Sequence, residues 1–258
     1  MVLKVNRNEH NVVTLTLNRP DKLNALSIEL VLALNDEFSK IKNDPTVRGI
    51  VLTGEGRAFT AGGDVEGMLN RLGKALDVKS RLLNGLYRLS DLIRSINRPV
   101  VAAINGICFG AGFVLSTACD ITYASDKAKF GFAYGNVGLI PEGAYFISRY
   151  AGLQRAKQLV FSRAIIDANQ AREYGFVLEV YPEEELMEKV YNQMNEWANG
   201  PIETIGLSKD ILNGAFENRL ADEQLIEAIT QGIAFTTAEH KEGVNAFIEK
   251  RKPNWKEL

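Results

Sequence analysis

Hydrophobic positions in the first part of the chain alternate with polar ones in short runs, which is typical of strands. Residues 2–6 and 12–17 are strand-like, and the polar stretch between them predicts a hairpin. Ser27 is a candidate N-cap for a helix that runs to about residue 43. Four apolar residues recur at helical spacing in that helix and are expected in the core: Leu30, Leu34, Phe38 and Ile41.

Two later segments repeat one arrangement, in which an apolar run opens into glycines. Residues 49–53 predict a buried strand, and residues 56–64 a tight loop after it. Residues 99–104 predict a second strand, followed by a glycine-rich turn and a helix that begins near residue 111. Between these segments the pattern predicts a short helix at residues 65–72 and a longer one at residues 78–96. Beyond them it predicts a strand at residues 120–124, a long loop at residues 130–144, and mainly helical sequence from residue 154 onward with one more strand at residues 177–181.

The glycine loops are the first candidates for chemistry. Two glycines after Ala61 remove side chains where a ligand could approach the backbone, and an NH aimed at a carbonyl oxygen stabilises charge that develops there. Ala111 lies where the first, unpaired NH groups of the predicted helix would be. An ordinary glycine turn and a packing contact between strand and helix explain the same residues. The glycine spacing matches neither the dinucleotide fingerprint nor a P-loop.

Composition narrows the function classes. The 258 residues are 46% hydrophobic and 24% charged, with a net charge of -2, which gives no electrostatic reason to expect nucleic acid or an anionic membrane as a partner. Cys108 and Cys119 lack metal-ligand spacing, and His10 and His240 lie far apart, so we expect reduced, buried thiols and no metal site. Neither a signal peptide nor a membrane span is evident, which predicts a cytoplasmic protein.

Several motifs together resemble the crotonase, or enoyl-CoA hydratase/isomerase, superfamily over nearly the whole chain. They are Leu17-Asn18-Arg19-Pro20 with Asn24-Ala25-Leu26, Arg57 to Asp64, Ala103 to Asp120, Gly138-Leu139-Ile140-Pro141, and the basic ending Phe247 to Pro253. The resemblance implies an α/β fold, a spiral of ββα units over residues 1–195, and a helical trimerisation region over residues 196–258. It also implies an acyl-CoA thioester substrate, with coenzyme A as part of the substrate rather than a separate cofactor, and a homotrimer or dimer of trimers.

The resemblance assigns roles to residues. Two backbone NH groups, at Ala61 and Ala111, would hold the thioester oxygen while an enolate forms. The remaining candidates form the substrate site: Lys22 and Leu23 along the coenzyme A through their backbone, Gly62 and Gly110 in the two NH loops, Asp64 in the loop bordering the adenine, and Tyr134 and Tyr145 in the acyl pocket. Core or loop packing explains the two tyrosines equally well.

Departures from the family pattern bear on the reaction. Hydratases of this family carry two glutamates, and the matching positions here are Val114 and Tyr134, of which neither suits a general base at neutral pH. Glu142, between Pro141 and Gly143, resembles the single base of some Δ3,Δ2-enoyl-CoA isomerases, although such a turn is often only solvated. We therefore expect an isomerase. The alternatives are a hydratase, an enzyme with Glu142 as nucleophile, and a non-catalytic acyl-CoA-binding protein.

Overall fold

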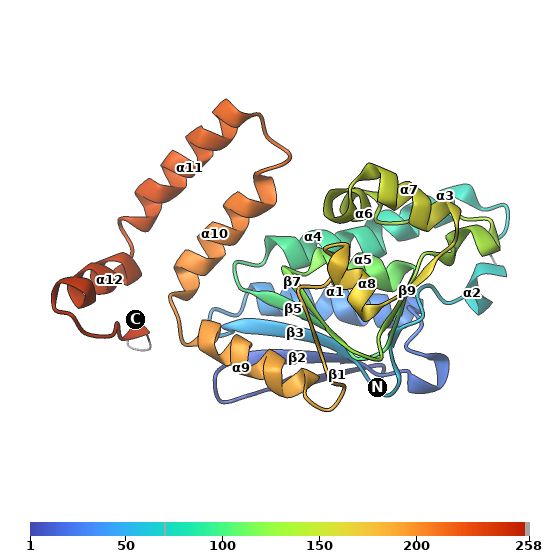
Figure 1. Ribbon diagram of the computed structural model, residues 1–258, viewed down its shortest axis with the longest axis horizontal. Coiled ribbons are helices and arrows are strands. Elements are labelled where there is room, and N and C mark those ends of the chain that lie inside the picture. The colour runs from blue at the N-terminus through green and yellow to red at the C-terminus, as the bar shows by residue number, and fades with distance from the viewer. Residues whose placement is uncertain (70, 256–258) are drawn as a thin grey trace.

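Two β-sheets form the centre of the computed structural model, which describes residues 1–69 and 71–255 (Figure 1). The larger sheet has the order β1-β2-β3-β5-β7-β10, and all its neighbours are parallel except the β1–β2 hairpin, in which Leu3 pairs with Leu17. The predicted hairpin is therefore confirmed. The strands are β1 (Leu3–Arg7), β2 (Val12–Leu17), β3 (Gly49–Gly54), β5 (Val100–Ile104), β7 (Ile121–Ser125) and β10 (Glu179–Tyr181).

The smaller sheet has the order β4-β6-β8-β9 and is built from strands of three residues. These are β4 (Ala58–Thr60), β6 (Ile107–Phe109), β8 (Lys129–Gly131) and β9 (Ile165–Asp167). The first three lie in or beside segments that were predicted as loops or turns from the sequence. Three residues are too few for an alternating pattern to register, and glycines flank these strands.

From β3 to β8, successive strands alternate between the two sheets. β3 and β4, β5 and β6, and β7 and β8 each give one strand to each sheet, and helices follow each pair. This repetition is the predicted spiral of ββα units, so the expected fold class is confirmed. It also sets the glycine loops after β4 and β6 side by side, because β4 pairs with β6.

Helices cover one face of the larger sheet. Ser27 caps α1 (Ile28–Lys42) by accepting a hydrogen bond from the NH of Leu30 at 3.2 Å, as predicted. The predicted helix at residues 65–72 is shorter, α2 (Glu66–Leu69), and Asn70 lies outside the described residues. The predicted helix at residues 78–96 is continuous but begins earlier. It comprises α3 (Ala75–Arg81), a π-helical stretch (Leu82–Tyr87) and α4 (Arg88–Ser95).

The core lies on both faces of the larger sheet. On one side α1, α4 and α5 (Ala111–Ala118) pack around large buried residues, among them Phe38, Phe113 and Phe130. On the other side α9 (Leu186–Ala198) packs its buried face against β2, β3 and β5. The four residues predicted as the core of the first helix are buried, and both cysteines are buried free thiols.

The C-terminal helices extend away from the sheets (Figure 1). A partly buried ion pair joins α10 (Ile202–Gly214) to the core, since the ammonium of buried Lys209 lies 2.9 Å from the carboxylate of half-buried Asp120 just before β7. The predicted division between residues 195 and 196 falls inside α9, and it stays a prediction. The remaining helices are α6 (Ala144–Ala151), α7 (Leu153–Phe161), α8 (Ala168–Glu173), α10 (Ile202–Gly214), α11 (Leu220–Ala234) and α12 (Ala238–Ile248).

Candidate active site

The loop after β4 is held by a buried asparagine from the N-terminal motif. The amide nitrogen of Asn24 donates to the carbonyls of Glu55 at 3.0 Å and Ala58 at 2.7 Å, and its amide oxygen accepts from the NH of Arg19 at 2.8 Å. The Arg19 guanidinium pairs with Asp64 at 3.2 Å. Asn24 is fully buried, so these bonds are shielded from water and fix the loop to the preceding segment.

The NH groups of this loop point in different directions. The NH of Ala61 donates to the carbonyl of Leu23 at 2.9 Å, so it is not free for a ligand, and its predicted role as an oxyanion donor is wrong. Gly62 accepts from the NH of Leu26 at 2.8 Å within the parallel bridge between Leu26 and Gly63. In a bridge of this register the NH of Gly63 points away from Leu26. It has no hydrogen-bond partner among the residues that the structure describes.

The second donor comes from the start of α5. The NH of Ala111 is the first of the helix, has no partner within it, and donates to no acceptor in the rest of the described chain. The two loops touch at Gly62, whose φ is 93°. A Cβ added there would lie 2.7 Å from the carbonyl oxygen of Phe109 and 3.4 Å from the nitrogen of Ala111. The geometry therefore brings Gly63 and Ala111 together as the pair of free NH groups.

A tyrosine hydroxyl joins the Pro-Glu-Gly turn to this helix. The hydroxyl of Tyr134 lies 3.0 Å from the carbonyl of Gly110 and 3.3 Å from the carbonyl of Glu142. A Cβ added to Gly143 would lie 2.8 Å from a methyl carbon of Val114, one helical turn beyond Ala111. The backbone of the turn thus rests on the same face of α5 that presents the free NH.

The electrostatics of this turn are set by burial. Glu142 is half-buried, and desolvation raises the pKa of its carboxyl above the ordinary value. Burial also raises the pKa of Tyr134, to which the charge of Glu142 adds, and the same two causes raise the pKa of Tyr87 from the helix that faces the turn. Tyr87 was not recognised from the sequence, because an aromatic residue in an apolar stripe reads as core. The carboxylate therefore lies among groups that stay neutral at neutral pH.

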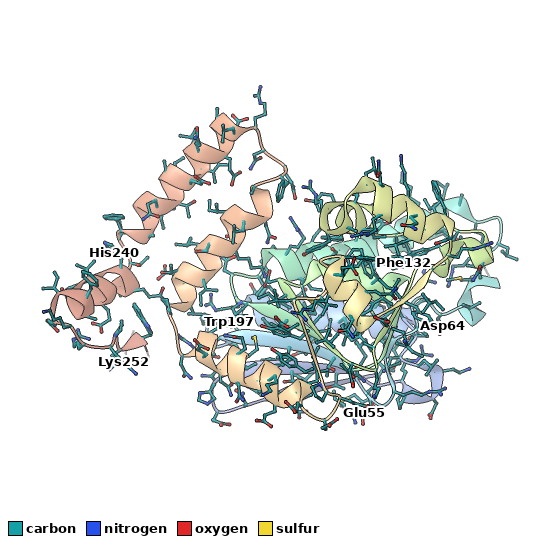
Figure 2. The ribbon with its side chains drawn as sticks, in the orientation of Figure 1. Glu55, Asp64, Phe132, Trp197, His240 and Lys252 are labelled. Atoms are coloured by element: carbon teal, nitrogen blue, oxygen red, sulfur yellow. The ribbon has the colours of Figure 1, made fainter. Side chains whose placement is uncertain are left out.

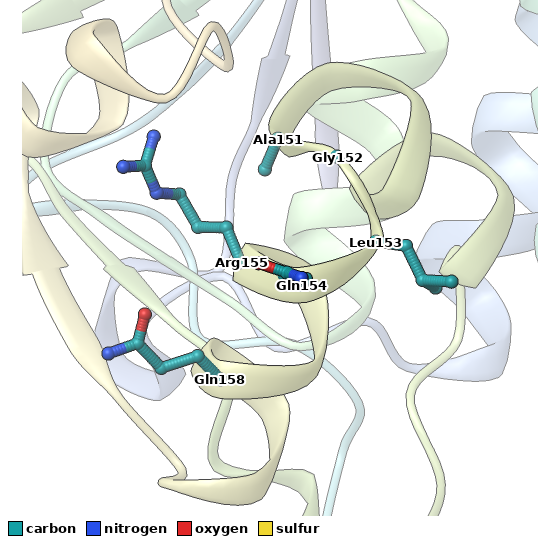
Figure 3. Close-up of a pocket in the computed structure, with 6 residues that line it drawn as sticks. All are labelled: Ala151, Gly152, Leu153, Gln154, Arg155 and Gln158. Carbon is teal, nitrogen blue, oxygen red and sulfur yellow. The ribbon is translucent and has the colours of Figure 1, made fainter.

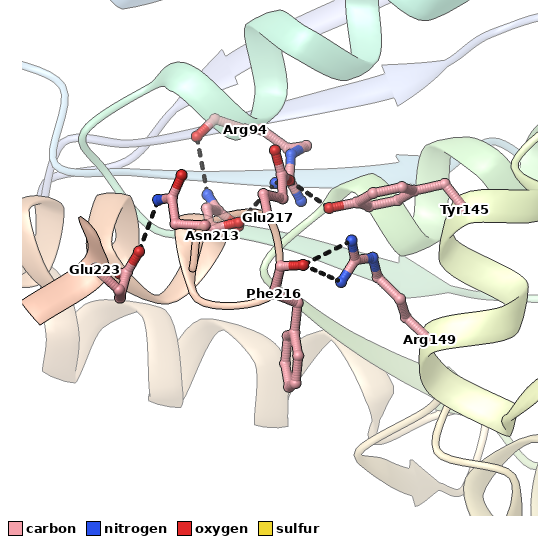
Figure 4. A network of polar contacts seen from close by, with 8 residues as sticks. Arg94, Tyr145, Arg149, Asn213, Phe216, Glu217 and Glu223 are labelled. Atoms are coloured by element: carbon pink, nitrogen blue, oxygen red, sulfur yellow. Dashed lines mark hydrogen bonds and ion pairs between the residues drawn. The ribbon is translucent and has the colours of Figure 1, made fainter. Parts of the chain in front are cut away.

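The helix after this turn is docked to the C-terminal region (Figure 4). The hydroxyl of Tyr145 donates to Glu217, which also pairs with Arg94 at 2.9 Å. The Arg149 guanidinium lies 4.0 Å from the centre of the Tyr145 ring and donates to the carbonyl of Phe216. These contacts engage the ring and hydroxyl of Tyr145, so they lend no support to its predicted place in the acyl pocket, which stays a prediction.

The other predicted substrate contacts lie near the loop after β4. Leu23, at a φ of 48°, donates its NH to the carbonyl of Pro20 at 3.0 Å, and its own carbonyl is bonded to Ala61. Lys22 ends the helical turn Pro20–Lys22 beside it. Asp64 lies at the opposite end of the molecule from Lys252 (Figure 2). Within one chain the basic ending is therefore separate from this site.

A hollow of the surface lies away from these loops. It has a volume of about 650 Å³ and is lined by residues at the start of α7, where Arg155 and Gln158 extend to the same side (Figure 3). Arg155 is stacked on Tyr174, and neither free NH group nor Glu142 lines this hollow. The chemistry is therefore assigned to the turn and the two loops.

Comparison with known proteins identifies the family. The profile described as Enoyl-CoA hydratase/isomerase matches residues 7–258. The chain belongs to the enoyl-CoA hydratase/isomerase family. The resemblance found from the motifs is thereby confirmed, and with it the crotonase superfamily.

Relatives within this family carry different activities in their names. A protein of Escherichia coli strain K12 named 1,2-epoxyphenylacetyl-CoA isomerase is 35% identical over 250 residues, which cover 96% of this chain and 95% of that protein. A mitochondrial enoyl-CoA hydratase of Pongo abelii is 35% identical over 259 residues, 99% of this chain and 88% of that protein. A crystal structure of an enoyl-CoA hydratase from Mycobacterium smegmatis superposes with a TM-score of 0.93 at 29% identity and covers 99% of both chains.

Within residues 1–69 and 71–255, no helix has the length and apolar character needed to cross a bilayer. The same residues contain no group of three or more His, Cys, Asp and Glu side chains placed to hold a metal ion.

Proposed function

We propose that the protein is a Δ3,Δ2-enoyl-CoA isomerase in which Glu142 moves the proton. The observation that carries this proposal is the Tyr134 hydroxyl, which lies within hydrogen-bond distance of carbonyls at both the Glu142 turn and Gly110, the residue before the free NH of Ala111. One base and an NH pair thus belong to one small structural unit. A thioester oxygen held by the NH groups of Gly63 and Ala111 would gain negative charge when a proton leaves C2.

The reaction needs only one carboxylate. Glu142 takes the proton from C2 of the 3-enoyl thioester, the electrons form a dienolate on the thioester oxygen, and the protonated Glu142 returns the proton to C4. The double bond then lies between C2 and C3, with no net gain or loss of atoms. The raised pKa of Glu142 suits this shuttle, because its protonated form must donate to carbon in the second half.

Hydration would need groups that activate and protonate water. Val114, at one of the two positions where hydratases carry glutamate, is buried and has no ionisable group. Tyr134, at the other, has its hydroxyl directed at backbone carbonyls and a pKa raised by burial. These contacts favour isomerisation over hydration, although several relatives are named hydratases.

The test is product analysis of 3-hexenoyl-CoA with the wild type and with Glu142→Gln. We expect formation of 2-hexenoyl-CoA by the wild type and a loss of at least about a hundredfold in kcat for the variant, as for removal of a general base. The matched control is Glu55→Gln, which removes a surface carboxylate paired with Lys4. A wild type that leaves 3-hexenoyl-CoA unchanged but adds water to 2-hexenoyl-CoA, supplied in a parallel incubation, would be a hydratase and would contradict the proposal. Tight binding with no exchange of the C2 proton would identify a binding protein.

We also propose that the active form is an oligomer. Large apolar side chains on α10 to α12 are exposed in the single chain, among them Leu212, Phe216, Leu225, Ile229 and Phe247. Exposed apolar surface of this extent is typical of a protein interface. The expected trimer or dimer of trimers accounts for it, and light scattering measures its mass.

A further inference from the structure

A cluster of positive charge lies on the segment that leaves the Gly63 loop. Arg71, Lys74 and Arg81 line a hollow of about 290 Å³ together with Asp77 and Ser80. None of the three cations forms an ion pair with a carboxylate of the described residues. The protein as a whole has a net charge of -2, so this concentration of unpaired cations is a local feature.

The arrangement is electrostatically unfavourable as it stands. Arg71 and Arg81 are half-buried, and both desolvation and the charge of Arg71 lower the pKa of Arg81. Like charges held close together on a partly desolvated surface repel each other, unless an anion lies between them. Two guanidinium groups supply flat, forked donors that match the oxygens of a carboxylate or a phosphate.

The cluster is close to the reacting end of the site. A Cβ added to Gly63 would lie 2.9 Å from the methyl carbon of Met68, which places the Met68 side chain against the free NH loop. The guanidinium of Arg71 folds back over Gly67, the residue before Met68, since a Cβ added to Gly67 would lie 3.1 and 3.2 Å from its two terminal nitrogens. The short segment from Gly63 to Arg81 therefore carries both the free NH and the basic hollow, so one ligand could contact both.

We propose that the hollow formed by Arg71, Lys74 and Arg81 binds an anionic group of the acyl-CoA ligand. This inference rests on the proposed function, which supplies the thioester. The anion has two chemical sources: a carboxylate at the far end of the acyl chain, or the phosphates of the coenzyme A. A carboxylate would define the substrate class as thioesters of dicarboxylic acids.

Equilibrium binding of saturated thioesters tests the proposal without requiring turnover. Three ligands separate the sources: hexanoyl-CoA, adipoyl-CoA, which adds a terminal carboxylate to the same chain length, and S-hexanoyl-pantetheine, which lacks phosphates. Calorimetry compares the wild type with Arg71→Gln/Arg81→Gln. The matched control is Lys79→Gln, which removes a cation of α3 that does not line the hollow. Circular dichroism checks that each variant is folded.

For a carboxylate, the double variant should bind adipoyl-CoA about tenfold more weakly and hexanoyl-CoA unchanged, as expected for lost charge-assisted bonds at a half-exposed site. For phosphate, it should lose about tenfold for both CoA thioesters and nothing for the pantetheine thioester. The proposal would be overturned if the double variant bound each of the three ligands as tightly as the wild type does. It would also be overturned if Lys79→Gln lost as much affinity as the double variant. Failure of the wild type to bind any of the three would instead remove the proposed function.

Discussion

Replacing single backbone NH groups by ester oxygens tests the assignment of the oxyanion donors. Side-chain substitution leaves the NH in place, whereas lactic acid at position 61 or 111, or glycolic acid at position 63, removes only that NH. The structure predicts different outcomes for the three esters. The NH of Ala61 is bonded to Leu23 at 2.9 Å, whereas those of Gly63 and Ala111 have no partner in the described chain.

The expected size of each effect depends on whether the NH that is removed is free or hydrogen-bonded. The esters at Gly63 and Ala111 should each lower kcat by about a hundred- to thousandfold, which corresponds to about 2.7–4 kcal/mol of lost transition-state stabilisation. The ester at Ala61 should cost about 1 kcal/mol of folding stability, the contribution of one backbone hydrogen bond, and change kcat by only a few-fold.

The esters also weaken the preceding carbonyl as an acceptor. At position 111 this is the carbonyl of Gly110, which accepts from Phe113 at 2.9 Å, and at position 63 it is that of Gly62, which accepts from Leu26 at 2.8 Å. Thermal unfolding measures the loss of folding stability caused by the weakened carbonyl, which should be about 1 kcal/mol. The assay is single-turnover isomerisation of 3-hexenoyl-CoA. A kcat loss for the Ala61 ester as large as that for the Gly63 ester would refute the assignment.

Three further outcomes are expected. Because burial raises the pKa of Glu142, the acid limb of kcat/KM against pH should lie above the ordinary glutamate value of 4.5, and a limb at or below that value would contradict its role as base. Because the pKa of Glu142 is higher in the folded than in the unfolded protein, the stability of the wild type falls as the pH rises from the unfolded to the folded pKa. Glu142→Gln should therefore have a higher Tm than the wild type at pH values above the folded pKa, and the same Tm at pH values below the unfolded pKa. Lys209→Met leaves the half-buried carboxylate of Asp120 with the NH of Val100 but without its cation, and should cost about 1–3 kcal/mol in denaturant unfolding; no measurable loss would show that the pair does not stabilise the fold.

The sequence predicted the elements whose residues repeat a pattern often enough to be read. The helix from Ser27 and the strands β3 and β5 are long enough for this, and their apolar residues fall on one face or form a buried run. The strands β4 and β6 have three residues each and were taken as loops, because their pairing is a property of the two chain segments together.

The candidate site shows the same limit at the level of single atoms. The motif around Ala61 lies in the loop after β4, and Ala111 was singled out because a helix start always leaves its first NH unpaired. The direction of an NH inside a loop depends on its acceptor, and the carbonyl of Leu23 lies 38 positions earlier by number. That the NH of Ala61 is bonded while that of Gly63 has no partner in the described chain could therefore not be predicted from the motif alone.

The contact between Val114 and Gly143 predicts that a second carboxylate at position 114 would not fit beside the proposed base Glu142. The methyl carbon of Val114 lies 2.8 Å from a Cβ added to Gly143, whose φ of 74° favours glycine, so the turn that carries Glu142 rests directly on that side chain. A longer side chain at position 114 must displace the turn, and its charge would be buried where Val114 is only 1% exposed.

Val114→Glu restores the residue type that hydratases carry, yet it should not restore hydration. Because the new side chain moves the turn, we expect isomerisation to fall at least about tenfold, the cost of misplacing a reacting group, with no addition of water to 2-hexenoyl-CoA. Val114→Gln has nearly the same shape without the charge and separates the displacement of the turn from the burial of a carboxylate. Water addition by Val114→Glu with isomerisation unchanged would mean that both carboxylates fit, and that the packing of the turn on α5 does not select the reaction.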